Sequence, residues 1–426
     1  MNRDLFDFIT ASPTSFHAVE TISKLLTQAE FVRLSEGEPW KLEKGKKYFV
    51  TRNDSSIIAF NIGRDISDFG FNITASHSDS PSFKLKEEPN LTSDLYTRLN
   101  TERYGGAILS TWFDRPLSLA GRVIIEKDGK LESRLINIGR NLLIIPNVSI
   151  HFNRELNSGY KYNEQVDTIP LFAQGASPDA LKKLIAEAAD TEPENILSHE
   201  LYLYCRSAPT VWGVDNEFIS APRLDDLQCA YATLMGFINS ENSRSVNVYC
   251  CFDNEEVGSQ TKQGAASNFF EDTLYRISNG LGYTHEEHLC ALSKSFMLSA
   301  DNAHAVHPNH PELSDSVNRP VLNGGPAIKV NAAQSYATDA PASALFRLIC
   351  KQADVPVQVF ANRSDKRGGG TLGNIAAGSV SIRMADIGLP QLAMHSAYET
   401  AGSKDTEYLV RASEKLYSVS VSDVWN

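Results

Sequence analysis

One short apolar run that ends abruptly in carboxylates constrains this chain more than any other stretch. Residues 246–252 are rich in β-branched and aromatic side chains, which indicates a buried strand. Residues 253–256, Asp-Asn-Glu-Glu, follow it directly. Ligands of open α/β sheets bind just beyond the carboxyl ends of strands, and adjacent carboxylates need a cation or a proton to offset their repulsion. We therefore predict an α/β fold in which Glu256 faces a metal and Glu255 faces a water on it. A solvated acidic loop is the alternative for the pair taken alone.

Two other segments deliver polar side chains in the same way. The predicted strand 69–75 runs into His77 and Asp79, which share a face of extended backbone because they are two residues apart. A histidine that binds a metal commonly needs a carboxylate to orient its ring, although an ordinary hydrogen-bonded histidine also fits. Asp225 and Asp226 precede a helical run, where they could bind a metal or simply cap the helix.

Further along, a strand at 296–299 runs into Asp301, and His395 precedes a segment, 397–404, that we expect to be helical. Together these positions offer imidazole nitrogen and carboxylate oxygen, which zinc accepts in one site. Five ligands with one shared between two ions, plus one carboxylate as a base, make up a two-metal hydrolase site. The candidate residues are His77, Asp225, Glu255, Glu256, Asp301 and His395.

The middle of the chain differs in character from its two ends. It contains many short β-like runs and one acid-rich helical piece at 177–189. We predict a catalytic domain formed by residues 1–88 and 222–426, with a β-rich domain, 89–221, inserted into it. His151 lies in an apolar run, 148–152, that we expect to be a strand, and its residue pattern alone favours a structural role.

Charge and composition exclude several classes of partner. The 426-residue chain carries a net charge of −12 without a cluster of Lys or Arg, so we expect no nucleic acid as partner. It has no apolar run of membrane-spanning length and no secretory signal pattern, so we expect no membrane partner. The six cysteines are scattered, as in reduced proteins. A cytoplasmic location follows as an expectation.

The motifs around the candidate residues resemble those of the aspartyl aminopeptidase family. Members of this family are co-catalytic dizinc exopeptidases. The similarity runs from end to end and includes SHSDSP around His77, PRLDDL around Asp225, DNEEVGS around Glu255, SADNAHAVHPN around Asp301, GPAIKVNAAQSYATD around Lys329 and MHS around His395. This resemblance implies an α/β fold. A mixed-sheet zinc exopeptidase domain would be sandwiched by helices and would carry an inserted, mostly β dimerisation domain.

The resemblance also implies a role for each residue. Asp225 would bridge two zinc ions per subunit, with Co²⁺ or Mn²⁺ as substitutes. His77 and Asp301 would complete one site, and Glu256 and His395 the other. Glu255 would be the general base, and Asp79 the acid behind His77. The residues expected to contact substrate are Lys329, which reads an acidic side chain, His304, Tyr336, and His151, which reaches a neighbouring subunit's active site.

The expected substrates are peptides with an N-terminal Asp or Glu, and the expected assembly is a tetrahedral homododecamer built from dimers. Asp226 stands where relatives often carry Asn. Two alternatives remain: a dizinc aminopeptidase or acyl-amino-acid deacylase without acidic preference, and a catalytically dead assembly shell. A glycosidase is a poor fit, because adjacent glutamates cannot flank a glycosidic bond and the two histidines would be unexplained.

Overall fold

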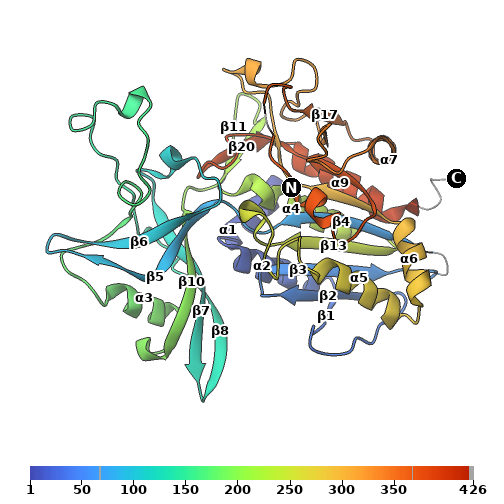
Figure 1. The fold of residues 1–426 in the computed structure, drawn as a ribbon, viewed down its shortest axis with the longest axis horizontal. Helices are drawn as coiled ribbons and strands as arrows, with labels where there is room; N and C mark the ends of the chain where they lie inside the picture. The colour runs from blue at the N-terminus through green and yellow to red at the C-terminus, as the bar shows by residue number, and fades with distance from the viewer. Residues whose placement is uncertain (67–68, 367, 422–426) are drawn as a thin grey trace. The chain divides into compact units, whose positions relative to one another are not determined.

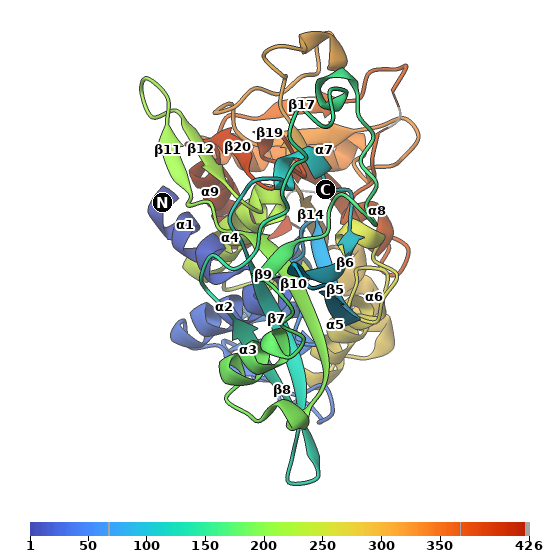
Figure 2. The same cartoon turned by 90° about the vertical axis from the view of Figure 1, so that its left-hand side faces the viewer.

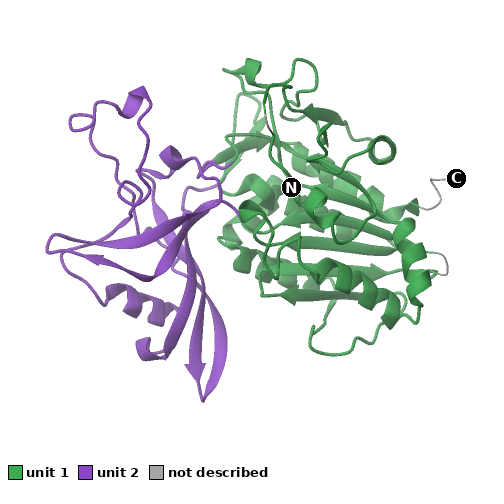
Figure 3. Ribbon diagram, viewed as in Figure 1, with its two compact units in different colours: residues 1–79, 210–394, 399–426 green, residues 80–209, 395–398 purple. Residues whose placement is uncertain are grey.

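The computed structural model describes residues 1–66, 69–366 and 368–421, and its contacts divide the chain into two compact units (Figure 3). Unit 1 comprises Met1–Asp79, Thr210–Met394 and the chain from Glu399 onward. Unit 2 comprises Ser80–Pro209 and the short segment His395–Tyr398. Our predicted domain boundaries lie at 88/89 and 221/222, whereas the contacts divide the chain at 79/80 and 209/210. None of the helices in the described residues has the length and apolar character needed to cross a bilayer.

Unit 1 is built on a mixed nine-stranded sheet with the order β1-β2-β3-β13-β4-β14-β18-β16-β17 (Figure 1). Its strands are β1 (Val32–Arg33), β2 (Lys47–Arg52), β3 (Ser56–Ile62), β4 (Phe71–His77), β13 (Val246–Phe252), β14 (Phe296–Ala300), β16 (Ala327–Val330), β17 (Gln358–Ala361) and β18 (Arg383–Gly388). The central strands β13, β4, β14 and β18 run parallel, so their carboxyl ends share one edge. The predicted α/β class with a mixed sheet is confirmed.

Helices cover both faces of this sheet, because its central strands are buried on both sides. The helices are α1 (Asn2–Ala11), α2 (Ser15–Gln28), α4 (Leu224–Asn239), α5 (Phe269–Gly280), α6 (His285–Ser293), α7 (Ala340–Gln352), α8 (Leu372–Ala376) and α9 (Asp405–Ser418). Side chains alternate along a strand. Accordingly, Val248, Cys250 and Phe252 of β13 pack in the cluster with α5, α6 and α8, while Tyr249 and Cys251 pack in the cluster with α1, α2 and α4.

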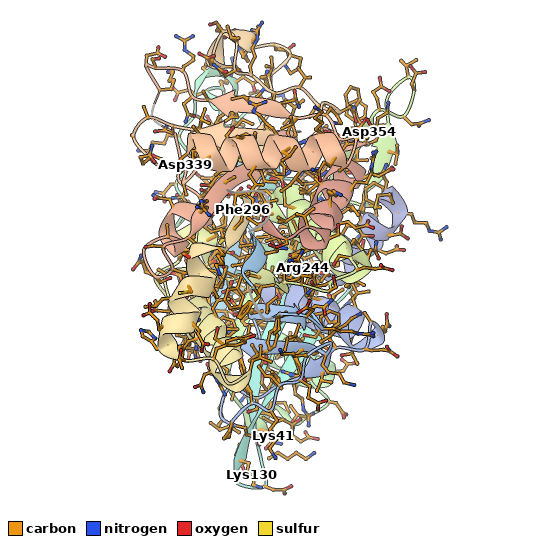
Figure 4. All side chains as sticks on the ribbon, turned by 90° about the vertical axis from the view of Figure 1, so that its right-hand side faces the viewer. Lys41, Lys130, Arg244, Phe296, Asp339 and Asp354 are labelled. Carbon is orange, nitrogen blue, oxygen red and sulfur yellow. The ribbon has the colours of Figure 1, made fainter. Side chains whose placement is uncertain are left out.

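The other half of the sheet is covered in the same manner. Helix α7 packs in a cluster with α4, α9 and the apolar side chains of β14 and β18. Figure 4 shows α7 with Asp339, its capping residue, at one end and Asp354 beyond the other. The Asp339 side chain accepts a hydrogen bond from the Ala342 backbone N–H at 2.8 Å, so the sequence itself sets where this helix begins.

A second, five-stranded sheet in unit 1 corrects one expectation. Its order is β11-β12-β20-β19-β15, formed by β11 (Thr210–Trp212), β12 (Phe218–Ala221), β15 (Ala303–His304), β19 (Pro390–Leu392) and β20 (Glu399–Gly402). The predicted helix at 397–404 is therefore wrong. Strand β20 pairs with both β12 and β19, and this pairing overrides a weak local preference.

Unit 2 is built on an antiparallel six-stranded sheet with the order β8-β7-β10-β5-β6-β9 (Figure 2). It consists of β5 (Ser82–Thr92), β6 (Tyr96–Tyr104), β7 (Leu117–Lys127), β8 (Lys130–Asn137), β9 (Leu171–Gln174) and β10 (Ile196–Cys205), with α3 (Ala180–Ala188) packed on it. The strand predicted at 148–152 is wrong, because this segment forms turns and Phe152 is 89% exposed. An apolar alternation stabilises a strand only where a partner strand and a core are present.

Candidate metal centre

Three neighbouring strands bring the candidate residues to one edge of the large sheet. β4 ends at His77, and its parallel neighbour β13 pairs Phe252 with His77 before the chain turns into Glu255 and Glu256. On the other side of β4, β14 ends at Ala300, directly before Asp301. The sheet order β13-β4-β14 therefore gathers side chains that are far apart in the sequence.

Asp225 and Asp226 reach the same place from the start of α4. Their backbone angles are not helical (φ −80°, ψ 110° for Asp225), and the peptide bond between them is cis. The backbone N–H of Asp225 donates to Glu399 Oε2 at 3.0 Å, and Asp226 Oδ2 accepts from the backbone N–H of His77 at 3.1 Å. The Asp226 carboxylate is therefore bonded to the end of β4 and not to the first turn of α4, which argues against simple helix capping by this residue.

The side chains converge closely enough to hold a cation. Ligand atoms of His77, Asp225, Asp226 and Asp301 all lie within 4.8 Å of one another, and the four residues are buried. His77 Nε2 is 3.5 Å from Asp225 Oδ1. Ligand atoms of His77, Glu255 and Glu256 also lie within 4.8 Å of one another.

Asp79 holds three of these groups in place. Its Oδ1 lies 3.4 Å from His77 Nδ1, and its main-chain carbonyl lies 3.1 Å from the same nitrogen. The Asp79 carboxylate also accepts the backbone N–H groups of Glu255 and Glu256, each at 3.2 Å. One buried side chain thus orients the imidazole and fixes the turn that carries both glutamates.

The charges of this cluster are unbalanced without a cation. Burial first, and then the neighbouring carboxylates, raise the pKa values of Asp226, Asp301 and Glu255, that of Glu255 to about 7. Burial opposes the charged form of His77, but hydrogen bonds to Asp225 and Asp79 raise its pKa well above the usual range. Asp226 Oδ1 is buried without a hydrogen-bond partner among the described residues. A mixed imidazole and carboxylate donor set with an excess of acids fits zinc.

His395, the remaining predicted ligand, belongs to the segment that groups with unit 2. Its Nδ1 lies 3.1 Å from the main-chain carbonyl of Gly106, in the same unit. Donation from Nδ1 selects the tautomer in which Nε2 carries the lone pair needed by a metal. Its position at the site stays a prediction.

A second group of side chains lies beside the acid cluster. Lys329 on β16 is buried, and its Nζ lies 3.5 Å from Asp301 Oδ1 and 5.8 Å from the centroid of the Tyr336 ring. The Phe360 ring is near the rings of both His304 and Tyr336, at centroid distances of 6.1 and 6.3 Å. The structure therefore brings three of the predicted substrate residues together, whereas His151 lies on an exposed turn of unit 2.

The sequence did not identify Phe360 or Glu399 as site residues, and it did not place Asp226 in the acid cluster. Phe360 is an ordinary apolar residue in a short strand, so nothing in the sequence marks it. Glu399 was hidden inside the segment wrongly expected to be helical. Asp226 carried a signal, its position next to Asp225, but a second acid there was equally consistent with a helix cap.

Comparison with known proteins gives the family. A family model described as "Aminopeptidase I zinc metalloprotease (M18)" matches residues 8–417. A relative named "Probable M18 family aminopeptidase 2" from Clostridium novyi (strain NT) is 48% identical over 425 residues, covering 98% of each chain. A counterpart with the same name from Clostridium acetobutylicum is 46% identical, again covering 98% of each chain.

Solved structures agree with the sequence relatives. A chain of the structure described as "Cryo-EM structure of the Ape4 and Nbr1 complex" is 37% identical with a TM-score of 0.95, covering 98% of this chain and 85% of that one. Yeast aminopeptidase 1 (Ape1) is 28% identical with a TM-score of 0.88, covering 100% of this chain and 98% of its own. The family expected from the motifs is confirmed, and with it the zinc exopeptidase fold. This chain belongs to the M18 family of zinc metalloproteases and is an aminopeptidase.

Proposed function

We propose that the enzyme removes N-terminal Asp or Glu residues from peptides, and one observation carries this proposal: the buried lysine beside the acid cluster. Lys329 is 4% exposed. A lysine is rarely buried unless an anion compensates its charge. Its neighbour Asp301 belongs to the cluster that would hold cations, and Asp386, a further negative charge nearby, is engaged by Ala337 and Thr371. A substrate carboxylate is therefore an anion suited to Lys329. The substrate side chain would then lie near Tyr336 and His304.

We further propose that the cluster holds two zinc ions, for which Co²⁺ or Mn²⁺ are chemically plausible substitutes. Asp225 would be shared, His77 and Asp301 would bind one ion, and Glu256 and His395 the other. The mixed donor set and the excess of buried carboxylates support this assignment. Bound zinc supplies Lewis-acid polarisation of the scissile carbonyl and lowers the pKa of water.

Glu255 is the proposed general base. It takes a proton from the attacking water and delivers it to the leaving amine. Two features support this role. The Asp79 carboxylate accepts the backbone N–H of Glu255 at 3.2 Å and so fixes the turn. Burial raises the pKa of Glu255 to about 7, close to the range where a base works best. Asp79 also keeps the His77 ring oriented.

Replacement of Lys329 tests the acidic preference. We expect Lys329→Met to lower kcat/KM for Asp- and Glu-anilides by about 100-fold, the scale of one charged hydrogen bond, with little change for Leu-anilide. Steady-state kinetics on Asp-, Glu-, Leu- and Lys-anilides measure this, before and after chelation and zinc reloading. Lys351→Met, on the exposed face of α7, is the matched control.

Each outcome assigns a different function. Loss of turnover on chelation together with loss of acidic preference in Lys329→Met supports the proposal. Metal-dependent turnover without acidic preference in the wild type favours the broad-specificity aminopeptidase or deacylase instead. Absence of cleavage for every substrate after zinc loading contradicts the peptidase chemistry and favours the inactive shell.

We also propose that the chain assembles into a homododecamer built from dimers. A related solved structure is described as a yeast mApe1 dodecamer, with a TM-score of 0.88 and 28% identity. Exposed apolar side chains around His151, including Val148, Ile150 and Phe152, support an interface at this segment of unit 2. His151 would then contact substrate in a neighbouring subunit. We expect sedimentation to give twelve times the 47.0 kDa chain mass, and a monomeric mass contradicts the proposal.

A further inference from the structure

We propose that Asp386 is a positioning residue of the pocket for the substrate's N-terminal side chain: its carboxylate holds the Tyr336 segment and the glycine-rich turn 368–371 against the strand edge beside Lys329. The inference rests on the proposed function and extends it to a residue without direct contact to substrate. Asp386 is 0% exposed and lies on β18.

The sheet places Asp386 between the two strands that carry the key charges. In the order β14-β18-β16, β14 runs into Asp301 and β16 carries Lys329. Ser299 of β14 pairs with Asp386 in the parallel ladder. In the antiparallel ladder on the other side Ile328 pairs with Ile387, so Lys329 lies at the level of Asp386, one residue further along.

Both oxygens of the Asp386 carboxylate accept hydrogen bonds from loops at this edge. Oδ2 accepts the backbone N–H of Ala337 at 2.5 Å, directly after Tyr336. Oδ1 accepts the hydroxyl of Thr371 at 2.7 Å, at the end of the glycine-rich turn. The backbone N–H of Asp386 in turn donates to Thr338 Oγ1 at 2.8 Å. One buried side chain therefore ties two separate loops to the sheet.

The packing around Asp386 explains a glycine that follows this turn. A Cβ atom built on Gly373 would lie 2.5 Å from Asp386 Oδ1 and 2.7 Å from Ser299 Cβ. Only glycine allows the start of α8 to approach the carboxylate this closely. The close approach at Gly373 brings the Thr371 hydroxyl within hydrogen-bonding distance of Asp386, so this hydrogen bond depends on the glycine as well as on the acid.

Asp386 also contributes charge. Burial opposes the protonated form of Lys329, but the negative charges of Asp301 and Asp386 raise the lysine's pKa nonetheless. Asp386 is therefore both a tie for two loops and a neighbouring negative charge, and two substitutions separate these contributions. Asp386→Asn removes the charge but keeps the ties, since its oxygen can accept from Ala337 and its amide can donate to the Thr371 hydroxyl. Asp386→Ala removes both.

The experiment compares Asp386→Ala, Asp386→Asn and Thr371→Val with the wild type on Asp- and Leu-anilides, in the zinc-loaded full chain. Zinc content and melting temperature are measured for each variant, and calorimetry measures binding of L-aspartate and L-leucine. Asp405→Ala is the matched control, because Asp405 is equally buried and accepts the backbone N–H groups of Asn323 and Gly325.

We expect Asp386→Ala to raise KM for Asp-anilide about tenfold with a much smaller change in kcat, and to weaken L-aspartate binding to the same extent. Leu-anilide turnover and L-leucine binding should change by less than about threefold. Asp386→Asn should keep the wild-type selectivity, and Thr371→Val should lie between the two. Asp405→Ala should leave the ratio of the two substrates unchanged.

Equal losses for both substrates in Asp386→Ala, or an asparagine variant as impaired as the alanine variant, would overturn the inference while the proposed function stands. If Asp386→Ala does not fold, Thr371→Val decides, and unchanged selectivity in that variant overturns the inference. A wild type without acidic preference refutes the proposed substrate itself, independently of any variant.

Discussion

Replacing Glu255 by glutamine is expected to lower kcat by about 10³-fold, within the range attributed to a general base, while zinc content and folding stay unchanged. Glutamine has the same shape, and its backbone N–H can still donate to Asp79 as that of Glu255 does at 3.2 Å. The amide cannot accept a proton from water, so only the proton transfer is lost. KM should change little, because the substrate pocket is untouched.

Kinetics and metal analysis of the same preparation check this expectation. Glu287→Gln is a suitable control, since Glu287 belongs to an exposed capping box at the start of α6. A glutamine variant that keeps more than a tenth of wild-type kcat would exclude Glu255 as the base. Loss of zinc together with activity would instead indicate that Glu255 helps to bind the metal.

The pH profile should identify the same residue. Burial is the main cause that raises the pKa of Glu255 to about 7. The charge of His77 lowers this pKa, whereas the charges of Asp301, Asp79 and Asp225 raise it. Bound cations lower this pKa, because they favour the carboxylate. A base works in its deprotonated form, so kcat falls as the pH drops through the pKa. This acidic limb should disappear in Glu255→Gln.

Replacing Asp225 by alanine is expected to remove zinc as well as activity, leaving below about 0.1% of wild-type turnover. Asp225 is buried, and its Oδ1 lies 3.5 Å from His77 Nε2. Because Asp225 is the proposed shared ligand, its loss should weaken binding at both metal positions. Zinc per subunit, measured after dialysis against micromolar zinc, should fall from two to less than one.

The adjacent acid provides the matched control. Asp226→Asn should keep zinc and most of its activity, because an amide oxygen can still accept the His77 backbone N–H now bound at 3.1 Å. An Asp225→Ala enzyme that retains two zinc ions would contradict the bridging role. Equal metal loss in both variants would assign Asp226 a direct share in binding zinc.

The sequence was sufficient to locate the cluster because strand ends obey a simple rule. Apolar runs end at His77, before Glu255 and before Asp301, and parallel neighbours bring such ends to one edge of a sheet. The family, the zinc exopeptidase fold and the aminopeptidase activity followed from the motifs at these positions.

The structural features that the sequence did not predict depend on contacts between distant segments. The segment 397–404 was expected to be a helix, yet β20 forms there because β12 and β19 flank it. The exposed turn at His151 was expected to be a strand, because periodicity does not reveal that a partner strand is missing. Asp386 lies within β18, but its link to Ala337 and Thr371 exists only after three elements have packed.

The contact between Lys329 and Asp301 gives the proposed site a thermodynamic property beyond its chemistry. Their atoms are 3.5 Å apart, so a lysine and a divalent cation would compete for one carboxylate. If Asp301 bound a cation, its negative charge would be shared with that cation, and more of the lysine's charge would be left for a substrate anion. Coupling of this kind is reciprocal. An acidic substrate bound at Lys329 would therefore tighten the hold on the metal by the same factor by which the metal tightens the hold on that substrate.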